Sequence, residues 1–459
     1  MSSAPHPRGL ALLNNAQLNR GTAFTHEERR LYGLEGLLPT QVESLDRQVE
    51  RIHRHLDAKG SNLERYIYLS GLRDQNETLF YRVLMSNPAR FVPIVYAPTL
   101  AAVCQQFSHI YRRPRGMYVS LDMRGRIRDV LGNWPAHDVR FLCVTTGGRI
   151  LGLGDIGVNG MGIPIGKLDL YTACGAVPPC VLLPVQLDIR TTNSALRADP
   201  LYLGLRREPP ATAELDEFVE EFVQAVQDVF PHACLHFEDW KGTDAIRYLE
   251  KYRTRVLRYN DDIQGTAAAT LAGLICALKI KNETLPTQRF LFLGAGSSGL
   301  GTADMLVAAM THEGLSERAA IERITLMDAG GLLETSRTDL SPQQARYAKN
   351  MPATDDLLDV VKTVRPSVLI GVSTAGGAFT RAVVETMAHI YERPILFPLS
   401  LPESTAECTA EQAYEWSMGQ ALVAARVRLS GVTRAVRRFH TGHVHNFYIF
   451  PALGRRSLT

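Results

Sequence analysis

The sequence lacks the features that mark several large classes of protein. Its seven cysteines are scattered, odd in number and contain no C-x-x-C pair. That usage predicts reduced thiols, and it excludes a disulfide framework or a zinc site built from paired cysteines. No run of 18 apolar residues occurs, so no membrane span is expected.

An excess of charge of one sign is also missing. The 50 basic and 47 acidic residues leave a net charge of only +3, which does not indicate binding to nucleic acid. There is no internal repeat and no low-complexity tract. The chain has 459 residues, of which 45% are hydrophobic, and at this length about two to four globular domains are expected.

The first hundred residues have the pattern of helices. Residues 41–56 place apolar side chains on one face at the 3.6-residue spacing of an amphipathic helix. The helical region ends near residues 93–96, a short apolar run that predicts a strand.

After residue 114 the pattern changes twice. Residues 114–258 combine short β-rich runs with one clear amphipathic helix at 214–230, which is typical of a mixed α/β domain. Residues 259–445 alternate strands with helices, which predicts a parallel, doubly wound sheet. Its predicted strands include residues 289–293, 324–327, 367–372 and 394–399.

A glycine motif follows the strand at 289–293 and opens a helix at 300–310. The motif G-x-G-x-x-G comprises Gly294, Gly296, Ser297, Ser298 and Gly299. In this position the glycines allow a tight turn, a close approach to a pyrophosphate and close helix packing. Asp328 ends the next predicted strand, where an acid bonds ribose hydroxyls. The alternative is a glycine turn in a domain that binds no nucleotide.

Two pairs of adjacent carboxylates stand out, Glu238 with Asp239 and Asp261 with Asp262. Several carboxylates without cysteine or histidine suit a hard cation such as Mg²⁺ or Mn²⁺. The alternative is a solvated surface, which is the commoner fate of adjacent acids in loops. Lys167 follows a glycine-rich loop, and a lysine desolvated beside a metal is able to act as a base.

Together these segments resemble the malic enzyme family. The blocks that carry the resemblance are residues 74–81, 93–96, 160–168, 237–239, 260–266, 294–299 and 448–451. The similarity starts near Gly9, so the transit peptide that the acid-free residues 1–23 suggest is not expected. Relatives continue for several helices beyond the last block.

The family fold implies an α/β protein of three domains. They are a helical N-terminal domain (1–113), a mixed α/β middle domain (114–258, to which 446–459 returns) and a Rossmann-like, doubly wound NAD-binding domain (259–445). The implied activity is oxidative decarboxylation of malate to pyruvate and CO₂, with NAD or NADP and with Mg²⁺ or Mn²⁺.

The family's catalytic roles map onto residues of this chain. The resemblance implies that Tyr96 is the general acid that protonates the enol, that Lys167 is the general base for the 2-hydroxyl, and that Asp261 supports the lysine. The implied metal ligands are Glu238, Asp239 and Asp262, the last of which also adjoins the nucleotide. The implied substrate contacts are Arg149 and Asn446.

Several positions depart from the family pattern, among them Thr146, Gly148, Leu401 and His445. The first two replace acids, and Leu401 replaces an asparagine that contacts substrate and nicotinamide. Loss of a buried hydrogen-bonding partner costs about 1–3 kcal/mol. Two alternatives to an ordinary malic enzyme therefore remain. One is a specialised or malolactic-like decarboxylase of a secondary-metabolite pathway, and the other is a weak or inactive paralogue that binds nucleotide and regulates.

The nucleotide is expected to be NAD rather than NADP. NADP-using relatives carry lysines in the segments that correspond to 328–332 and 341–345, and neither segment holds a cation here. Asp328 would also repel a 2′-phosphate, unless Arg337 or Arg346 compensates. We further expect a small-molecule substrate, no nucleic-acid or membrane partner, a homo-oligomer (dimer or tetramer) and a cytoplasmic rather than mitochondrial location.

Overall fold

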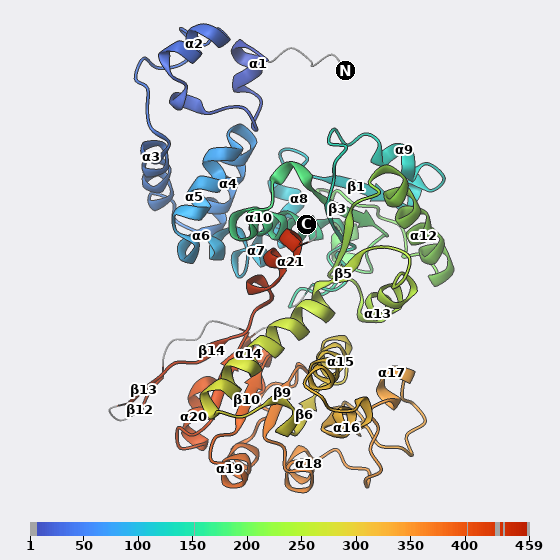
Figure 1. Cartoon of the computed structure of the whole chain (residues 1–459). Helices are drawn as coiled ribbons and strands as arrows, with labels where there is room; N and C mark the ends of the chain where they lie inside the picture. Colours follow the sequence, from blue (N-terminus) through green and yellow to red (C-terminus); the bar gives the residue numbers. More distant parts are fainter. Residues whose placement is uncertain (1–6, 151, 402, 427–431, 435–436, 457–459) are drawn as a thin grey trace. The chain divides into compact units, whose positions relative to one another are not determined.

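A computed structural model of the chain describes residues 7–150, 152–401, 403–426, 432–434 and 437–456 (Figure 1). The chain divides into two compact units, Met1–Leu235 with Pro451–Thr459, and His236–Phe450. They are called unit 1 and unit 2 below, and each is described by itself.

Unit 1 opens with a helical region, as the periodicity predicts. Its helices are α1 (Gly9–Leu13), α2 (His26–Tyr32), α3 (Leu45–Asp57), α4 (Asn62–Gln75), α5 (Glu77–Ser86), α6 (Pro88–Val95), α7 (Thr99–Gln105) and α8 (Phe107–Ile110). Helix α3 begins where the Ser44 side chain accepts a 3.2 Å hydrogen bond from the Arg47 N–H, which satisfies one unpaired donor of the first turn. Its buried face carries Val49, Ile52 and Leu56.

The strand predicted at residues 93–96 is wrong, because the first three of these residues end helix α6. Asn87 caps this helix through a 3.1 Å bond from the Arg90 N–H, and Pro88 stands in the first turn, where its missing donor costs nothing. Phe91, Ile94 and Val95 are buried at helical spacing. The periodicity of the longer window therefore prevails over a four-residue apolar run.

The rest of unit 1 contains parallel strands in the order β1-β3-β2. These are β1 (Met117–Ser120), β2 (Phe141–Thr145) and β3 (Leu182–Asp188), and their register pairs Val119 with Leu187 and Val144 with Val185. The helices are α9 (Ile127–Leu131), α10 (Gly162–Gly175), α11 (Ser194–Ala198), α12 (Thr212–Val229) and α21 (Phe450–Arg456). The predicted amphipathic helix at 214–230 is confirmed as α12.

Unit 2 contains a seven-stranded sheet in the order β14-β11-β10-β9-β6-β7-β8, in which only the β7–β8 pair is antiparallel. Its strands are β6 (Phe290–Leu293), β7 (Ile324–Asp328), β8 (Gly331–Leu332), β9 (Val368–Gly371), β10 (Ile395–Pro398), β11 (Leu422–Ala425) and β14 (Gly442–His443). The predicted parallel sheet is thus confirmed. Strands β4 (Cys234–Glu238) and β5 (Arg258–Asn260) precede it in the chain.

Helices cover both faces of this sheet. One face packs against α14 (Thr266–Lys281), α15 (Ser297–His312) and α16 (Glu317–Glu322), and the other against α18 (Leu357–Val364), α19 (Arg381–Ile390) and α20 (Ala410–Trp416). Unit 2 also contains α13 (Gly242–Lys251) and α17 (Pro342–Ala345). Side chains alternate between two cores along the central strands. Phe290 and Phe292 pack in one cluster with helices α14 and α15, and Leu291 packs in the other with α18 and α19. Burial on both faces is typical of doubly wound sheets.

One stretch, Asp261–Lys281, is long and apolar enough to cross a membrane by length and composition alone, with a mean hydropathy of 1.5. Half of it is buried, and Leu274, Ala277 and Leu278 belong to the core of unit 2. A core helix of a globular domain gives the same signal.

Candidate functional site

The glycine motif connects β6 to α15 in unit 2, and its three glycines have different surroundings. Gly294 has φ +122°, and a Cβ there would lie 2.6 Å from the Val372 carbonyl oxygen. A Cβ on Gly299 would lie 2.1 Å from the Gly294 carbonyl oxygen, so the helix packs tightly against the turn. A Cβ on Gly296 would meet nothing within 4 Å, which leaves open space beside the backbone.

Asp328 ends β7 and is held by its neighbours. Arg337 donates to its two carboxylate oxygens at 2.7 and 3.1 Å, and the Gly330 N–H donates at 2.8 Å. Hydrogen bonds to Asp339 and Asp328 raise the pKa of Arg337 above its ordinary range, so the guanidinium stays charged. Arg346, by contrast, is bonded to Asp304 at 2.7 Å and to Glu317 at 2.6 Å.

Three predicted metal ligands come together in unit 2. Glu238, Asp239 and Asp262 each offer a carboxylate oxygen, and these atoms lie within 4.8 Å of one another. Asp239 adopts φ +52°, a left-handed conformation uncommon for a residue other than glycine, and its N–H donates to Asp262 Oδ2 at 2.9 Å. Such outliers cluster at functional sites, where the surrounding structure holds them in place.

Asp261 lies in the same part of unit 2, at the start of a π-helical turn, Asp261–Gly265. Asp261 is buried, with 1% of its surface exposed. Its carboxylate accepts a short hydrogen bond from the Tyr259 hydroxyl and one of 2.9 Å from Asn446 Nδ2. A Cβ at Gly265 would lie 1.9 Å from Asp261 Oδ1, so this contact requires glycine. π-turns inside helices are frequent at functional sites.

Asn446 therefore contacts protein groups within unit 2. Besides the Asp261 carboxylate, its Nδ2 atom donates to the Asp261 carbonyl oxygen at 3.1 Å and to Thr266 Oγ1 at 3.2 Å. The substrate contact that the resemblance implies for Asn446 stays a prediction, while its bonds to Asp261 are what the structure shows. His445, a departure from the family pattern, uses its ring to accept from the Phe447 N–H at 3.3 Å.

Tyr96 and Lys167 belong to unit 1, and both are buried. Tyr96 follows the last residue of α6, and Lys167 lies within α10. The two helices approach closely at Gly166. A Cβ there would lie 2.9 Å from the Val95 carbonyl oxygen and 3.3 Å from the Tyr96 ring. The absence of a side chain at Gly166 thus brings the predicted acid next to the segment that carries the predicted base.

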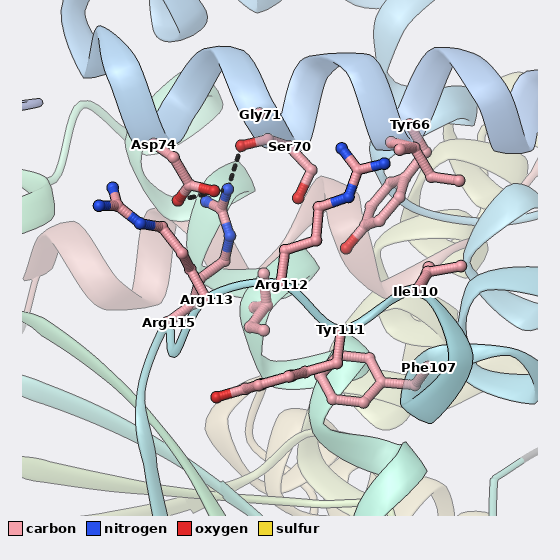
Figure 2. A pocket seen from close by; sticks show the side chains of 12 residues that line it. Tyr66, Ser70, Gly71, Asp74, Phe107, Ile110, Tyr111, Arg112, Arg113 and Arg115 are labelled. Carbon is pink, nitrogen blue, oxygen red and sulfur yellow. Dashed lines mark hydrogen bonds and ion pairs between the residues drawn. The ribbon is translucent and has the colours of Figure 1, made fainter. Parts of the chain in front are cut away.

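Arg149 is exposed at the end of the segment that follows β2, beside the bridge between Ile150 and Gly154. Thr146 is buried and accepts from the Gly148 N–H at 3.2 Å. The cavity shown in Figure 2 lies elsewhere in unit 1, between α4 and residues 107–115. None of the sequence-predicted site residues is among the described residues that line it. Asp74 pairs there with Arg115 at 2.7 Å.

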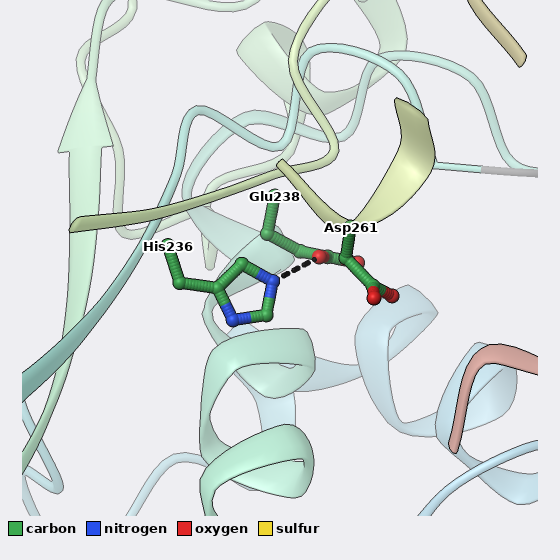
Figure 3. Close-up of side chains that lie close together, drawn as sticks. All are labelled: His236, Glu238 and Asp261. Carbon is green, nitrogen blue, oxygen red and sulfur yellow. Dashed lines mark hydrogen bonds and ion pairs between the residues drawn. The ribbon is translucent and has the colours of Figure 1, made fainter. Parts of the chain in front are cut away.

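Two buried residues that form hydrogen bonds near the candidate site were not predicted from the sequence. His236 lies two residues before Glu238 on β4, and its Nε2 is 2.8 Å from Glu238 Oε2 (Figure 3). The two-residue spacing on a strand was the available signal. Glu407 is fully buried and accepts from the Ser373 N–H and hydroxyl, both at 3.2 Å, and from the Ser400 hydroxyl. No local sequence pattern indicates these bonds, because Ser373 lies 34 positions before Glu407 and Ser400 lies seven positions before it.

Family models match most of the chain. A model described as the malic enzyme N-terminal domain matches residues 73–253, and one described as the malic enzyme NAD binding domain matches residues 263–458. The NADP-dependent malic enzyme of Homo sapiens is 44% identical over 450 residues, covering 98% of this chain and 79% of that protein. The NAD-dependent malic enzyme of Vibrio parahaemolyticus is 44% identical over 455 residues, covering 97% and 81%.

Solved structures give the same fold. The crystal structure of Entamoeba histolytica malic enzyme has a TM-score of 0.52 at 21% identity, covering 92% of this chain and 74% of that one. The NAD-dependent malic enzyme of Thermotoga maritima has a TM-score of 0.52 at 18% identity, covering 80% and 79%. At these identities the likeness shows the α/β architecture alone.

Proposed function

The chain belongs to the malic enzyme family, and on that premise we propose that it catalyses oxidative decarboxylation of malate to pyruvate and CO₂ with a nicotinamide dinucleotide as hydride acceptor. One observation supports this most strongly. The Asp262 carboxylate groups with Glu238 and Asp239, and the Asp262 carbonyl oxygen accepts a 3.0 Å bond from Ser298 Oγ in the glycine motif. A candidate cation ligand is therefore bonded to the candidate nucleotide loop.

Glu238, Asp239 and Asp262 would hold a divalent cation. Their donor set consists of carboxylate oxygens, which suits Mg²⁺ or Mn²⁺. When bound, the cation supplies Lewis-acid polarisation of the 2-hydroxyl and its adjacent carboxylate, and the nicotinamide accepts the hydride. The bond from the Asp239 N–H to Asp262 orients two of the three ligands toward each other.

We propose the family's acid–base roles for three residues. Lys167 takes the proton of the 2-hydroxyl, Tyr96 donates a proton to the enol carbon, and Asp261 supports the base. The burial of all three favours these roles, because water is kept from the groups that transfer protons. Arg149, whose guanidinium is a planar fork of donors, would bind a substrate carboxylate. Asn446 would keep the Asp261 carboxylate in place.

NAD is the nucleotide that the residues around Asp328 favour. The relatives named above include one described as NADP-dependent and one described as NAD-dependent, so similarity alone does not decide the choice. An acid at the end of the second strand of such a sheet bonds the ribose hydroxyls of NAD and would repel a 2′-phosphate, and we assign this role to Asp328. Arg346 is bonded to Asp304 and Glu317, and Arg337 is bonded to Asp328 and Asp339, so both nearby cations already have anionic partners.

Substitution of Asp262 tests the proposed function. Asp262→Asn should lower Mn²⁺ affinity at least about tenfold and lower kcat, because one of the three anionic ligands is lost. Dinucleotide affinity should change less than about threefold, since Ser298 bonds the Asp262 backbone, which the substitution retains. Asp355→Asn, at an exposed position of unit 2, is the matched control. Unchanged Mn²⁺ affinity in Asp262→Asn would reject the proposed cation site.

A further inference from the structure

The carboxylate of Glu238 has a histidine directly behind it. His236 and Glu238 are separated by one residue on β4, so their side chains leave the strand on the same face. Both residues are buried, and His236 Nε2 lies 2.8 Å from Glu238 Oε2 (Figure 3). A Glu238 that binds a cation is ionised and accepts only, so the ring nitrogen is the donor.

The nitrogen of His236 has two conceivable uses, as a hydrogen-bond donor to Glu238 or as a metal ligand. His236, Glu238 and Asp261 also offer donor atoms within 4.8 Å of one another, as a ligand group would. The 2.8 Å contact favours the first use, because it is the ordinary length of a charge-assisted hydrogen bond. An ionised carboxylate has about four acceptor positions, so this bond leaves Glu238 capacity to bind a cation.

The buried carboxylate of Asp261 also accepts a hydrogen bond from an aromatic side chain. The ring of His236 packs edge-on against Tyr259, with centroids 5.0 Å apart and an interplanar angle of 63°. Tyr259 donates to Asp261, as described above. Two neighbouring ring side chains, one on β4 and one on β5, are thus each hydrogen-bonded to one carboxylate. His236 holds a proposed metal ligand, and Tyr259 holds an acid to which no cation is assigned.

We propose that His236 is a positioning residue for the divalent cation. Its Nε2–H fixes the Glu238 carboxylate in the orientation that binds the metal, and it contributes no ligand atom itself. The inference rests on the proposed cation site. Hydrogen-bonding partners of metal ligands typically account for about 10–100-fold in metal affinity, because a ligand held in place loses less freedom on binding.

Two variants that differ only in reach separate this role from a general effect on folding. His236→Gln places an amide nitrogen near the position of Nε2, whereas His236→Asn is too short to reach Glu238 there. We expect Mn²⁺ affinity, measured by electron paramagnetic resonance of free Mn²⁺, to fall about 10–100-fold in His236→Asn and less than about threefold in His236→Gln. Tyr259→Phe should lower kcat while Mn²⁺ affinity stays within about threefold.

The outcomes distinguish this inference from the function on which it rests. Equal Mn²⁺ affinity in wild type and His236→Asn would overturn the positioning role and leave the cation site standing. An equally large loss in His236→Gln and His236→Asn, with unchanged melting temperatures, would show that the imidazole is itself a ligand. If the wild-type protein binds no Mn²⁺, the proposed cation site and the role of His236 both fail.

Discussion

Removing the carboxylate of Asp328 should change the nucleotide that the protein prefers. In the wild type, unit charges about 4 Å apart repel by about 1 kcal/mol in water and about 4 kcal/mol at an effective dielectric constant of 20. The Asp328 side chain is 21% exposed and bridged by Arg337, so the lower part of that range applies. We expect NAD⁺ to bind at least about tenfold more tightly than NADP⁺, which corresponds to about 1.4 kcal/mol.

In Asp328→Ala the repulsion disappears, and Arg337 loses one of its two anionic partners. The bond from the ribose hydroxyls to the carboxylate is lost as well, which weakens NAD⁺ binding by about 1.5–3 kcal/mol, a figure that already includes the exchange with water. The dissociation constant of NADP⁺ divided by that of NAD⁺ should therefore fall about 30-fold or more, equivalent to about 2 kcal/mol. Calorimetric titration of both nucleotides at one salt concentration measures this ratio.

Two further variants check the cause of the shift. Arg337→Ala leaves the charge of Asp328 without its bridging cation, so discrimination against NADP⁺ should increase. Arg346→Ala should leave the ratio within about twofold, because that guanidinium is bonded to Asp304 and Glu317. A ratio unchanged by Asp328→Ala, or a ratio that Arg346→Ala changes by more than about twofold while Arg337→Ala leaves it unchanged, would show that Asp328 does not govern the choice.

Three other outcomes are expected. Lys167→Ala should lower kcat by about 10²–10⁴-fold with unchanged nucleotide affinity, and equal activity would remove Lys167 from the mechanism. Glu407→Gln should weaken NAD⁺ binding about tenfold at unchanged Mn²⁺ affinity, because Glu407 bonds Ser373 and Ser373 lies against Gly294. The thiol reagent DTNB at pH 8 should label only the three exposed cysteines, Cys174, Cys180 and Cys276. Burial raises the pKa of Cys408 to about 12, so rapid labelling of that thiol would contradict the fold.

The sequence predicted the parts of the fold that depend on regular patterns. The strand before the glycine motif is β6 and the helix after it is α15, because the glycine spacing and the alternation of strand and helix are local signals. The run at 93–96 was misassigned, since four apolar residues suit either a strand or one side of a buried helix. The helical pattern of the longer preceding segment predicts the observed helix α6 correctly.

The supports of the candidate site were harder to predict. The acids are visible in the sequence as adjacent pairs, but the histidine that bonds one of them, His236, stands two positions before Glu238 and outside either pair. Asn446 lies 185 positions from Asp261, to which it is bonded, and no local pattern reports such a contact. Long-range hydrogen bonds depend on the packed fold, so they appear only once the strands and helices are assembled.

The most direct test is the product balance of a single reaction. The purified protein is incubated with L-malate, NAD⁺ and Mn²⁺, and NADH, CO₂ and the organic product are quantified together. We expect equal amounts of NADH, CO₂ and pyruvate, with none formed after chelation of the metal. Lactate and CO₂ without net NADH would favour the malolactic-like alternative, and no turnover while Mn²⁺ and NAD⁺ bind normally would contradict the proposed catalytic function.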